Sequence, residues 1–261
     1  MRIYIGFDDT DTYDSDRGTG KLARWFEDAL PKTCRLWGVV RQQLFLDPSI
    51  PYTTHNSSAC AIVETTDSVT IEDLIPLAIH HIERHFIPGS DPGLCLVSEG
   101  HSALLRLIDF GRSCTTKIVT QQGAIKAALG AHLSGNGGTN DGIIGAAAAV
   151  GLTVYGWSGR FIEFGRLRDL PEKVFISDLE QLGVTVVSID RDAHVPALED
   201  LVHSKGWLRP RLWAGKPVLP VIPKDKNLWE TVEERRRKKK NKEGGKEHGR
   251  ENFLQGERES R

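Results

Sequence analysis

Three aspartates follow directly on a short apolar segment near the start of the chain. Residues 3–5 predict a strand, and the string G-F-D-D-T-D-T begins at Gly6, where we expect a turn to open. Its carboxylates are Asp8, Asp9 and Asp11. Carboxylates this close repel one another, and they stay ionised together only where a cation or hydrogen-bond donors neutralise them. Oxygen ligands suit Mg²⁺, which commonly binds together with phosphates. The pattern therefore predicts a metal–nucleotide site, and the alternative is a solvated loop whose side chains cap backbone N–H groups.

A glycine-rich segment precedes a small-residue helix far along the chain. It reads S-G-N-G-G-T-N-D-G-I-I-G-A-A-A-A-V-G over residues 134–151. Glycine permits tight turns and a close approach to a ligand, and the free N–H groups of the helix predicted over residues 143–150 can bind an anion. The segment lacks a Walker Gly-Lys-Ser/Thr, and residues 124–133 before it predict a helix rather than the strand of a dinucleotide fingerprint. A loop that only packs the helix closely on a sheet is the alternative.

The composition limits the class of protein. The chain has 261 residues and a formal net charge of -1, which gives no argument for a nucleic-acid or membrane partner. Its four cysteines form no C-x-x-C pair, which argues against a zinc ribbon and a disulfide scaffold. We find no signal peptide and no run that approaches the ~20 apolar residues of a membrane span. We therefore expect a cytoplasmic protein with no membrane contact.

The order of the expected elements predicts an α/β (α+β) protein. Helices are predicted where apolar residues recur at spacings of three and four, and strands at short apolar runs. The helices are expected at residues 20–30, 71–85, 102–110, 124–133, 143–150 and 177–182. The strands are expected at residues 3–5, 36–40, 59–64, 94–97, 174–176 and 185–189, with a further extended stretch at 43–46.

These elements divide the chain into four expected parts. Residues 1–46 form the first part of a nucleotide-binding domain, and residues 47–115 have the element order of a ferredoxin-like unit. Residues 116–223 complete the nucleotide-binding domain and add a C-terminal αβ extension. Residues 224–261 are predicted to be a disordered charged tail, because too little apolar surface is present there to offset the ordering entropy. The basic run at 235–242 favours a solvated tail over a nucleic-acid arm.

Five segments together resemble one known family. They are G-F-D-D-T-D-T at 6–12, R-G-T-G-K-L-A at 17–23, P-Y-T-T-H-N-S at 51–57, D-P-G at 91–93 and N-D-G-I-I-G-A-A-A-A-V-G at 140–151. In order and spacing they are similar to the N-terminal half of the archaeal 2-agmatinylcytidine synthetases that act on an isoleucine tRNA. Those enzymes attach agmatine to a cytidine of the tRNA anticodon and consume ATP.

The resemblance implies a kinase-like nucleotide-binding domain with a ferredoxin-like insert, and a reaction that uses ATP and magnesium. It implies that Asp8, Asp9 and Asp11 hold Mg²⁺ and the ATP phosphates, and that Thr19 matches a threonine that becomes phosphorylated. Catalysis is thus expected at Thr19, Asp8 and Asp9. The nucleotide is expected at Gly6, Asp11, Lys21, Gly137, Gly138, Gly142 and Gly145. The acidic turn and Gly142 should therefore lie close together in space.

The sequence also departs from the family pattern. An arginine of the family is His55 here, and a basic residue of its phosphate loop is Asp141. The barrel and zinc ribbon that hold tRNA in the family have no counterpart in these 261 residues. We therefore predict an ATP-dependent phosphotransferase or ligase whose acceptor is a small amine or another small molecule, with tRNA as a further candidate partner. The alternative is a nucleotide-binding or RNA-associated module that has lost the reaction.

Four residues have a structural alternative to a functional role. Thr19 could cap the helix that follows it, with its hydroxyl bonded to a backbone N–H. Lys21 could reach a phosphate or could be an ordinary surface lysine. His81 and His85 have the i,i+4 spacing of a metal pair, but with no third ligand nearby a solvated helix end is favoured.

Overall fold

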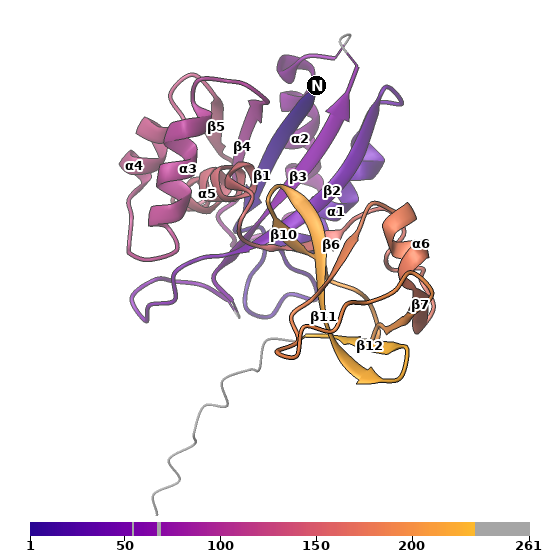
Figure 1. The fold of residues 1–261 in the computed structure, drawn as a ribbon. Helices are drawn as coiled ribbons and strands as arrows, with labels where there is room; N and C mark the ends of the chain where they lie inside the picture. Colours follow the sequence, from indigo (N-terminus) through magenta and orange to yellow (C-terminus); the bar gives the residue numbers. More distant parts are fainter. Residues whose placement is uncertain (54, 67–68, 233–261) are drawn as a thin grey trace, which may run out of the picture.

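The computed structural model describes residues 1–53, 55–66 and 69–232, and these form one sheet of 12 strands with helices on both faces (Figure 1). The strands are β1 (Arg2–Asp8), β2 (Cys34–Gln43), β3 (Ser57–Thr65), β4 (Gly93–Ser98), β5 (His132–Gly135), β6 (Arg160–Glu163), β7 (Lys173–Phe175), β8 (Thr185–Ser188), β9 (Leu201–His203), β10 (Arg211–Trp213), β11 (Lys216–Asp225) and β12 (Leu228–Thr231). The helices are α1 (Thr19–Trp25), the 3₁₀ helix η1 (Phe26–Ala29), α2 (Ile71–His85), α3 (Leu104–Ser113), α4 (Gln121–Ala127), α5 (Gly142–Tyr155) and α6 (Ile176–Gln181).

The first half of the sheet is antiparallel, with β1 between β3 and β4. Its strand order is β5-β4-β1-β3-β2-β6, and each neighbouring pair is antiparallel. Strand β1 is buried on both faces, and Ile3, Ile5 and Phe7 are each 0% exposed. A strand with one fully buried face therefore delivers Asp8 to one end of the sheet.

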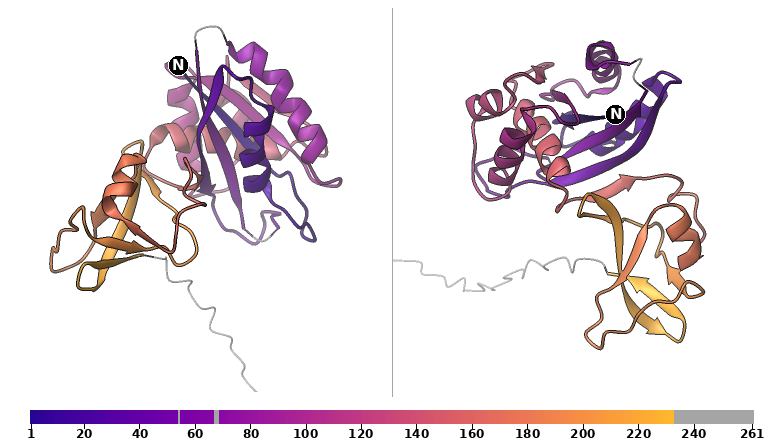
Figure 2. Two further views of the ribbon diagram at one scale, coloured as in Figure 1. Left: turned by 90° about the vertical axis from the view of Figure 1, so that its right-hand side faces the viewer. Right: turned by 45° about the horizontal axis from the view of Figure 1, so that its top comes forward.

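Helices cover the two faces of this half separately (Figure 2). On one face Ile3, Ile5 and Phe7 pack with side chains of α1, η1 and α2, such as Leu22 and Leu74. The other face holds Tyr4 and other strand side chains together with α3, α4 and α5. The acidic turn after β1 thus lies where the two helical layers end.

Helix α5 approaches the sheet so closely that only small residues fit. A Cβ added at Gly6 would lie 2.1 Å from the carbonyl oxygen of Ala146, and one at Gly93 would lie 2.0 Å from atoms of Gly142. This packing explains the alanine-rich sequence of α5, because larger side chains would hold the helix away from β1 and β4.

The second half of the sheet forms its own core. Strands β6 to β12 and helix α6 enclose a cluster that includes Phe161, Leu179 and Trp229, next to Val40 of β2. The predicted helix and strands at residues 174–189 are confirmed, whereas β6, β9, β10, β11 and β12 were not predicted. The extension is therefore mainly a β structure rather than a small αβ unit.

The parts predicted at residues 1–46, 47–115 and 116–223 contribute strands to the same sheet. Strands β3 and β4, from residues 47–115, flank β1 directly. The first half of the sheet then continues into β10 through β6. A mixed α/β fold is confirmed, but the split into a kinase-like domain and a ferredoxin-like insert is not.

Two local expectations need correction. The turn does not open at Gly6, because β1 continues to Asp8. The helix expected at 124–133 ends at Ala127, and the chain turns at Gly130 (φ 90) before β5 pairs with β4. Glycine at this positive φ avoids the steric strain that another residue would suffer.

Ordered structure also extends past residue 224. Strand β12 ends at Thr231 and pairs with both β9 and β11. Trp229 is 5% exposed, and its indole N–H donates to the carboxylate of Asp200 at 2.8 Å. A buried indole with a hydrogen-bond partner explains why this end of the sheet is stable. The remainder of the predicted tail, residues 233–261, lies outside the described residues.

None of the helices in the described segments has the length and hydropathy that crossing a membrane requires.

Candidate functional site

A cavity of about 700 Å³ opens at the end of β1. Its lining comes from the acidic turn, the segment between β2 and β3, the turn before β4, the segment between α3 and α4, and the first turn of α5. Elements far apart in sequence therefore meet at one site, as expected for the acidic turn and the glycine-rich segment.

Carboxylates dominate the charge of this cavity. The acidic side chains of its lining are Asp8, Asp9, Asp11, Asp91 and Asp141. Burial raises the pKa of Asp8 well above its usual value, and the neighbouring Asp9 adds to the effect. The pKa of Asp9 rises to about 6, first through burial and then through the charges of Asp91, Asp11 and Asp141. A cation bound here would relieve this repulsion.

Asp8 and the start of α5 lie in direct contact. A Cβ added at Gly145 would lie 1.7 Å from Asp8 Oδ2, which leaves no room for any other residue at this position. Asp9 itself adopts a left-handed backbone conformation (φ 48), which Asp tolerates better than most residues. The predicted closeness of the acidic turn and the loop before α5 is confirmed.

Thr19 hydrogen-bonds to Asp11 rather than capping a helix. Its hydroxyl donates to Asp11 Oδ1 at 3.2 Å, and its backbone N–H donates to the same oxygen at 3.1 Å. Thr19 Oγ1 also accepts from the backbone N–H and the hydroxyl of Thr10, at 3.2 and 3.1 Å. Gly18 is the N-cap of α1, so the capping alternative for Thr19 is wrong. A hydroxyl in this position can lose its proton to the carboxylate that accepts it.

Asp91 holds the glycine-rich loop in place. Its carboxylate accepts from the Thr139 hydroxyl and from the backbone N–H groups of Asn140 (2.7 Å) and Asp141 (3.2 Å). Its own N–H donates to the carbonyl oxygen of Asp9 at 3.1 Å. Sequence reasoning placed Asp91 only in a turn motif, because its role depends on the pairing of β4 with β1.

The other predicted residues divide into two groups. Gly142 and Gly145 line the cavity with Asp8, Asp9, Asp11 and Thr19. Gly6, Lys21, Gly137 and Gly138 do not belong to this lining.

The residues outside the lining have other surroundings. Gly6 lies inside β1 under α5, and a Cβ added at Gly138 would lie 2.6 Å from Asp91 Oδ1. A Cβ at Gly137 would lie 3.6 Å from Pro92 Cδ. Lys21 lines a second cavity, with its Nζ 5.0 Å from the centre of the Trp25 ring. These positions give the nucleotide contacts proposed for the four residues no support.

The acidic turn fits Mg²⁺ by its donor atoms, although it is not a complete three-ligand site. In the described part of the chain, only Asp190, Asp192 and His194 bring three ligand atoms within 4.8 Å of one another. Mg²⁺ commonly takes one or two carboxylates and completes its shell with phosphates and water. The oxygen donors and surplus negative charge of Asp8 and Asp9 satisfy that requirement.

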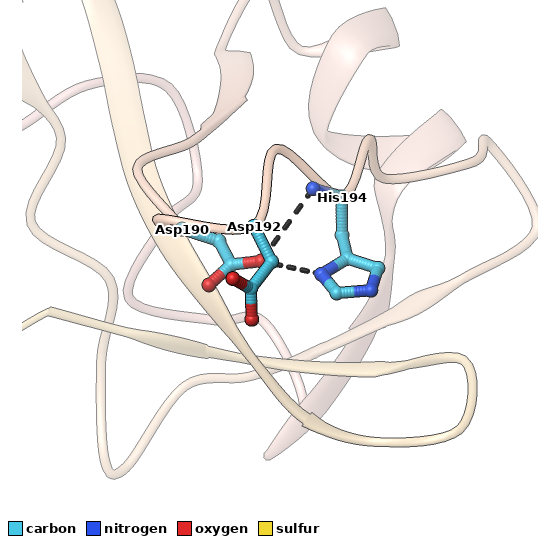
Figure 3. Close-up of side chains that lie close together, drawn as sticks. All are labelled: Asp190, Asp192 and His194. Carbon is cyan, nitrogen blue, oxygen red and sulfur yellow. Dashed lines mark hydrogen bonds and ion pairs between the residues drawn. The ribbon is translucent and has the colours of Figure 1, made fainter.

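The group around His194 is explained by an ion pair. His194 Nδ1 donates to Asp190 Oδ2 at 2.5 Å, and Asp192 lies beside them (Figure 3). This hydrogen bond lowers the pKa of Asp190 and raises that of His194. The group follows β8 and lies outside the lining of both cavities.

The histidines of α2 belong to no group of three metal ligands in the described part of the chain. His81 is 4% exposed, so a solvated helix end is wrong for this residue. Its Nε2 lies 2.9 Å from the carbonyl oxygen of Leu22, and its ring centre is 4.6 Å from that of His85. Burial lowers the pKa of His81, which favours a neutral ring that donates to Leu22.

Comparison with known proteins gives a partial structural similarity. No family model and no curated protein matches the chain. The similar solved structures include apo TiaS, an agmatidine synthetase of an isoleucine tRNA, with a TM-score of 0.47 and 24% identity over 58% of this chain and 35% of that chain. A complex of TiaS with that tRNA, AMPCPP and agmatine has a TM-score of 0.49 and 22% identity over 69% of this chain and 44% of that chain. A tRNA fluorescent labeling enzyme has a TM-score of 0.48 and 25% identity over 58% and 36%.

The chain thus spans less than half the length of these proteins. At these TM-scores, all three below 0.5, the similarity assigns no function to this chain.

Proposed function

We propose that this protein is a magnesium-dependent enzyme that binds ATP in the acidic cavity and transfers its γ-phosphoryl group. The observation that carries the proposal is the meeting of three features in one cavity: the acidic turn, the first turn of α5 and the hydroxyl of Thr19. Phosphoryl transfer depends mainly on positioning and on neutralising charge, and these features provide both.

Asp8 and Asp9 are the residues that would hold the metal. Both carboxylates line the cavity next to α5, and their pKa values are raised first by burial and then by neighbouring carboxylates. A bound magnesium ion would supply charge neutralisation for the carboxylates and for the phosphate oxygens. Gly142 and Gly145 line the cavity beside these carboxylates, so a triphosphate held by the metal would lie near the first turn of α5.

Thr19 and Asp11 would carry the transfer step. The Thr19 oxygen attacks the γ-phosphorus of the substrate ATP, and the bond from that phosphorus to the bridging oxygen breaks. Asp11 Oδ1 already accepts the Thr19 hydroxyl and takes its proton, and ADP leaves. The product is phosphothreonine at residue 19, from which the phosphoryl group passes to an acceptor. Thr19 is 6% exposed, so water has little access to this oxygen.

The acceptor is the open part of the proposal. The resemblance of the five sequence motifs to agmatinylcytidine synthetases makes a small amine and tRNA the first candidates, and a ligase the first reaction class. One observation favours a nucleotide-binding module without turnover instead. Asp141 lines the cavity where the family has a basic residue, and Gln121 donates to it at 2.7 Å.

Calorimetric titration with ATP tests the binding part of the proposal. We expect ATP to bind the full chain with Mg²⁺ and not with EDTA. Asp8→Asn or Asp9→Asn should weaken binding by at least roughly tenfold, because a metal ligand loses its charge. Asp190→Asn is the matched control, since it removes a carboxylate outside both cavities, and it should bind ATP as the parent protein does. Equal affinity in all four proteins would contradict a metal–nucleotide site in the acidic turn.

A further inference from the structure

The second cavity, of about 340 Å³, has the opposite charge from the first. Its lining cations outnumber its carboxylates by four to one, and they are Lys21, Arg24, Arg41 and Arg168 against Asp11. One further carboxylate, Glu163, binds both Arg24 (2.7 Å) and Arg168 (3.2 Å). Positive charge still exceeds negative charge, so the cavity attracts anions.

Arg41 contributes charge that no acid offsets. Its Nε donates to Ser57 Oγ at 3.0 Å, and across the described residues it pairs with no carboxylate. Burial lowers its pKa first, and the charges of Arg209 and Arg160 lower it further. Several guanidinium groups therefore concentrate positive potential at this end of β2.

Arg168 is held in position by an aromatic ring. Its guanidinium carbon lies 4.0 Å from the ring centre of Trp207, and that of Arg209 lies 4.2 Å from the same ring. Such cation–π contacts order a side chain that would otherwise be mobile. The Nε of Arg168 donates to Glu163, and its Nη2 donates to the carbonyl oxygen of Ile162 at 2.9 Å. The remaining N–H groups of this oriented guanidinium can donate to a phosphate or carboxylate oxygen.

The two cavities share a wall. Asp11, Thr19, Thr53, His55 and Ser57 line both of them. A molecule in the basic cavity therefore lies next to Thr19, the residue that the proposed function places at the point of transfer.

We propose that the basic cavity binds the acceptor substrate through a phosphate or carboxylate group of that substrate, with Arg41 and Arg168 as its ligands. The assignment of the bound molecule as the acceptor rests on the proposed function, whereas the anion site itself does not. The same charges disfavour a cationic amine such as agmatine in this cavity.

Anion titration of the full chain tests the site. Inorganic phosphate and acetate are titrated separately by calorimetry in EDTA, so that the metal-free acidic cavity repels both. At least one of the two should bind, and the comparison identifies the anion class. Arg41→Gln and Arg168→Gln should each weaken that binding roughly tenfold, the effect of losing one charge-assisted hydrogen bond. Arg112→Gln is the control, because Arg112 also stacks on an aromatic ring, Tyr155, but lines neither cavity.

Two results would overturn the inference: no binding of either anion to the parent protein, or unchanged binding in both arginine variants. Thermal unfolding checks that each variant folds. If Arg41→Gln does not fold, Arg41→Lys provides the test, because it keeps the charge and should bind the anion more weakly than the parent. Magnesium–ATP titration of the same proteins separates the two proposals. Phosphate binding without ATP binding would overturn the proposed function alone, and ATP binding without anion binding would overturn this inference alone.

Discussion

Two neighbouring cavities of this protein have opposite charge and share a wall that includes Thr19. The acidic cavity is lined by five aspartates, and the basic one by three arginines and a lysine. Thr19 and Asp11 belong to both linings. The contrast implies different requirements for entry, because phosphates need a metal ion on the acidic side and need none on the basic side.

The two cavities also differ in how the chain builds them. The acidic one depends on a close backbone approach, in which Gly145 lets α5 contact Asp8. The basic one depends on long side chains from β2, α1 and the region after β6, ordered by pairing with Glu163 and by stacking on Trp207. Substitutions should therefore affect shape in the first cavity and charge in the second.

The largest expected effect comes from Thr19, one of the residues that line both cavities. Thr19→Val removes the hydroxyl and nearly preserves the shape of the side chain. Incubation with Mg²⁺ and ATP should add one phosphate to the parent protein and none to the variant, while both still bind ATP. Intact-mass spectra measure this directly. A phosphate on Thr19→Val, or none on the parent with ATP and candidate acceptors supplied, would remove Thr19 from the reaction.

A smaller effect is expected from adding a side chain at Gly145, where α5 contacts Asp8 in the acidic cavity. Gly145→Ala adds a Cβ that would lie 1.7 Å from Asp8 Oδ2, so Asp8 and α5 must separate. We expect a loss of about 1–3 kcal/mol in the free energy of unfolding, as for other overpacked sites, together with weaker ATP binding.

Gly18→Ala is the matched control for this change. Its added Cβ lies 3.6 Å from Asp11 Oδ2, an ordinary contact, at a backbone φ of -122 that alanine accepts. Chemical denaturation of both variants makes the comparison. Equal free energies of unfolding for Gly145→Ala and Gly18→Ala would contradict the direct contact between α5 and Asp8.

The smallest expected effect is a pH-dependent gain in the free energy of unfolding, and it comes from Asp9 in the acidic cavity. The pKa of Asp9 is raised from 3.8 to about 6, so the unfolded chain loses this proton at lower pH than the folded protein does. Asp9 therefore lowers the stability of the metal-free protein as pH rises from about 4 to about 6. Asp9→Asn should remove this decrease and raise the free energy of unfolding at pH 7 by up to about 1 kcal/mol after solvent screening.

Denaturant unfolding in EDTA at pH 4 and pH 7 tests this prediction. The gain of Asp9→Asn over the parent should be present at pH 7 and absent at pH 4. Arginines keep their charge throughout this range, so the guanidinium groups of the basic cavity do not contribute to this pH dependence. A variant less stable than the parent at pH 7 without metal would contradict the repulsion among these aspartates.

The acidic cavity could be predicted from the sequence because its signals are local. Asp8, Asp9, Asp11 and Thr19 lie within 12 residues of one another, next to a strand that is easily predicted. The bounds of α2 matched the prediction at both ends, because its apolar spacing is regular and a Thr70–Asp73 capping box marks its start.

The basic cavity could not be predicted, because it depends on pairings distant in sequence. Arg168 and Trp207 reach β2 only through the β2–β6 and β6–β10 pairs. The second half of the sheet was missed for a related reason. Strand β11 contains Pro217, Pro220 and Pro223, and proline normally argues against a strand because it lacks an N–H donor. Its several partners, β8, β10 and β12, stabilise it in the folded protein.

A crystal structure with Mg²⁺ and the ATP analogue AMPCPP tests the central claim most directly, because it shows which cavity holds the nucleotide. The account predicts a metal at Asp8 and Asp9, phosphates beside Gly142 and Gly145, and the γ-phosphate facing the hydroxyl of Thr19. A triphosphate bound instead among Arg24, Arg41 and Arg168, with no metal at the acidic turn, would contradict it.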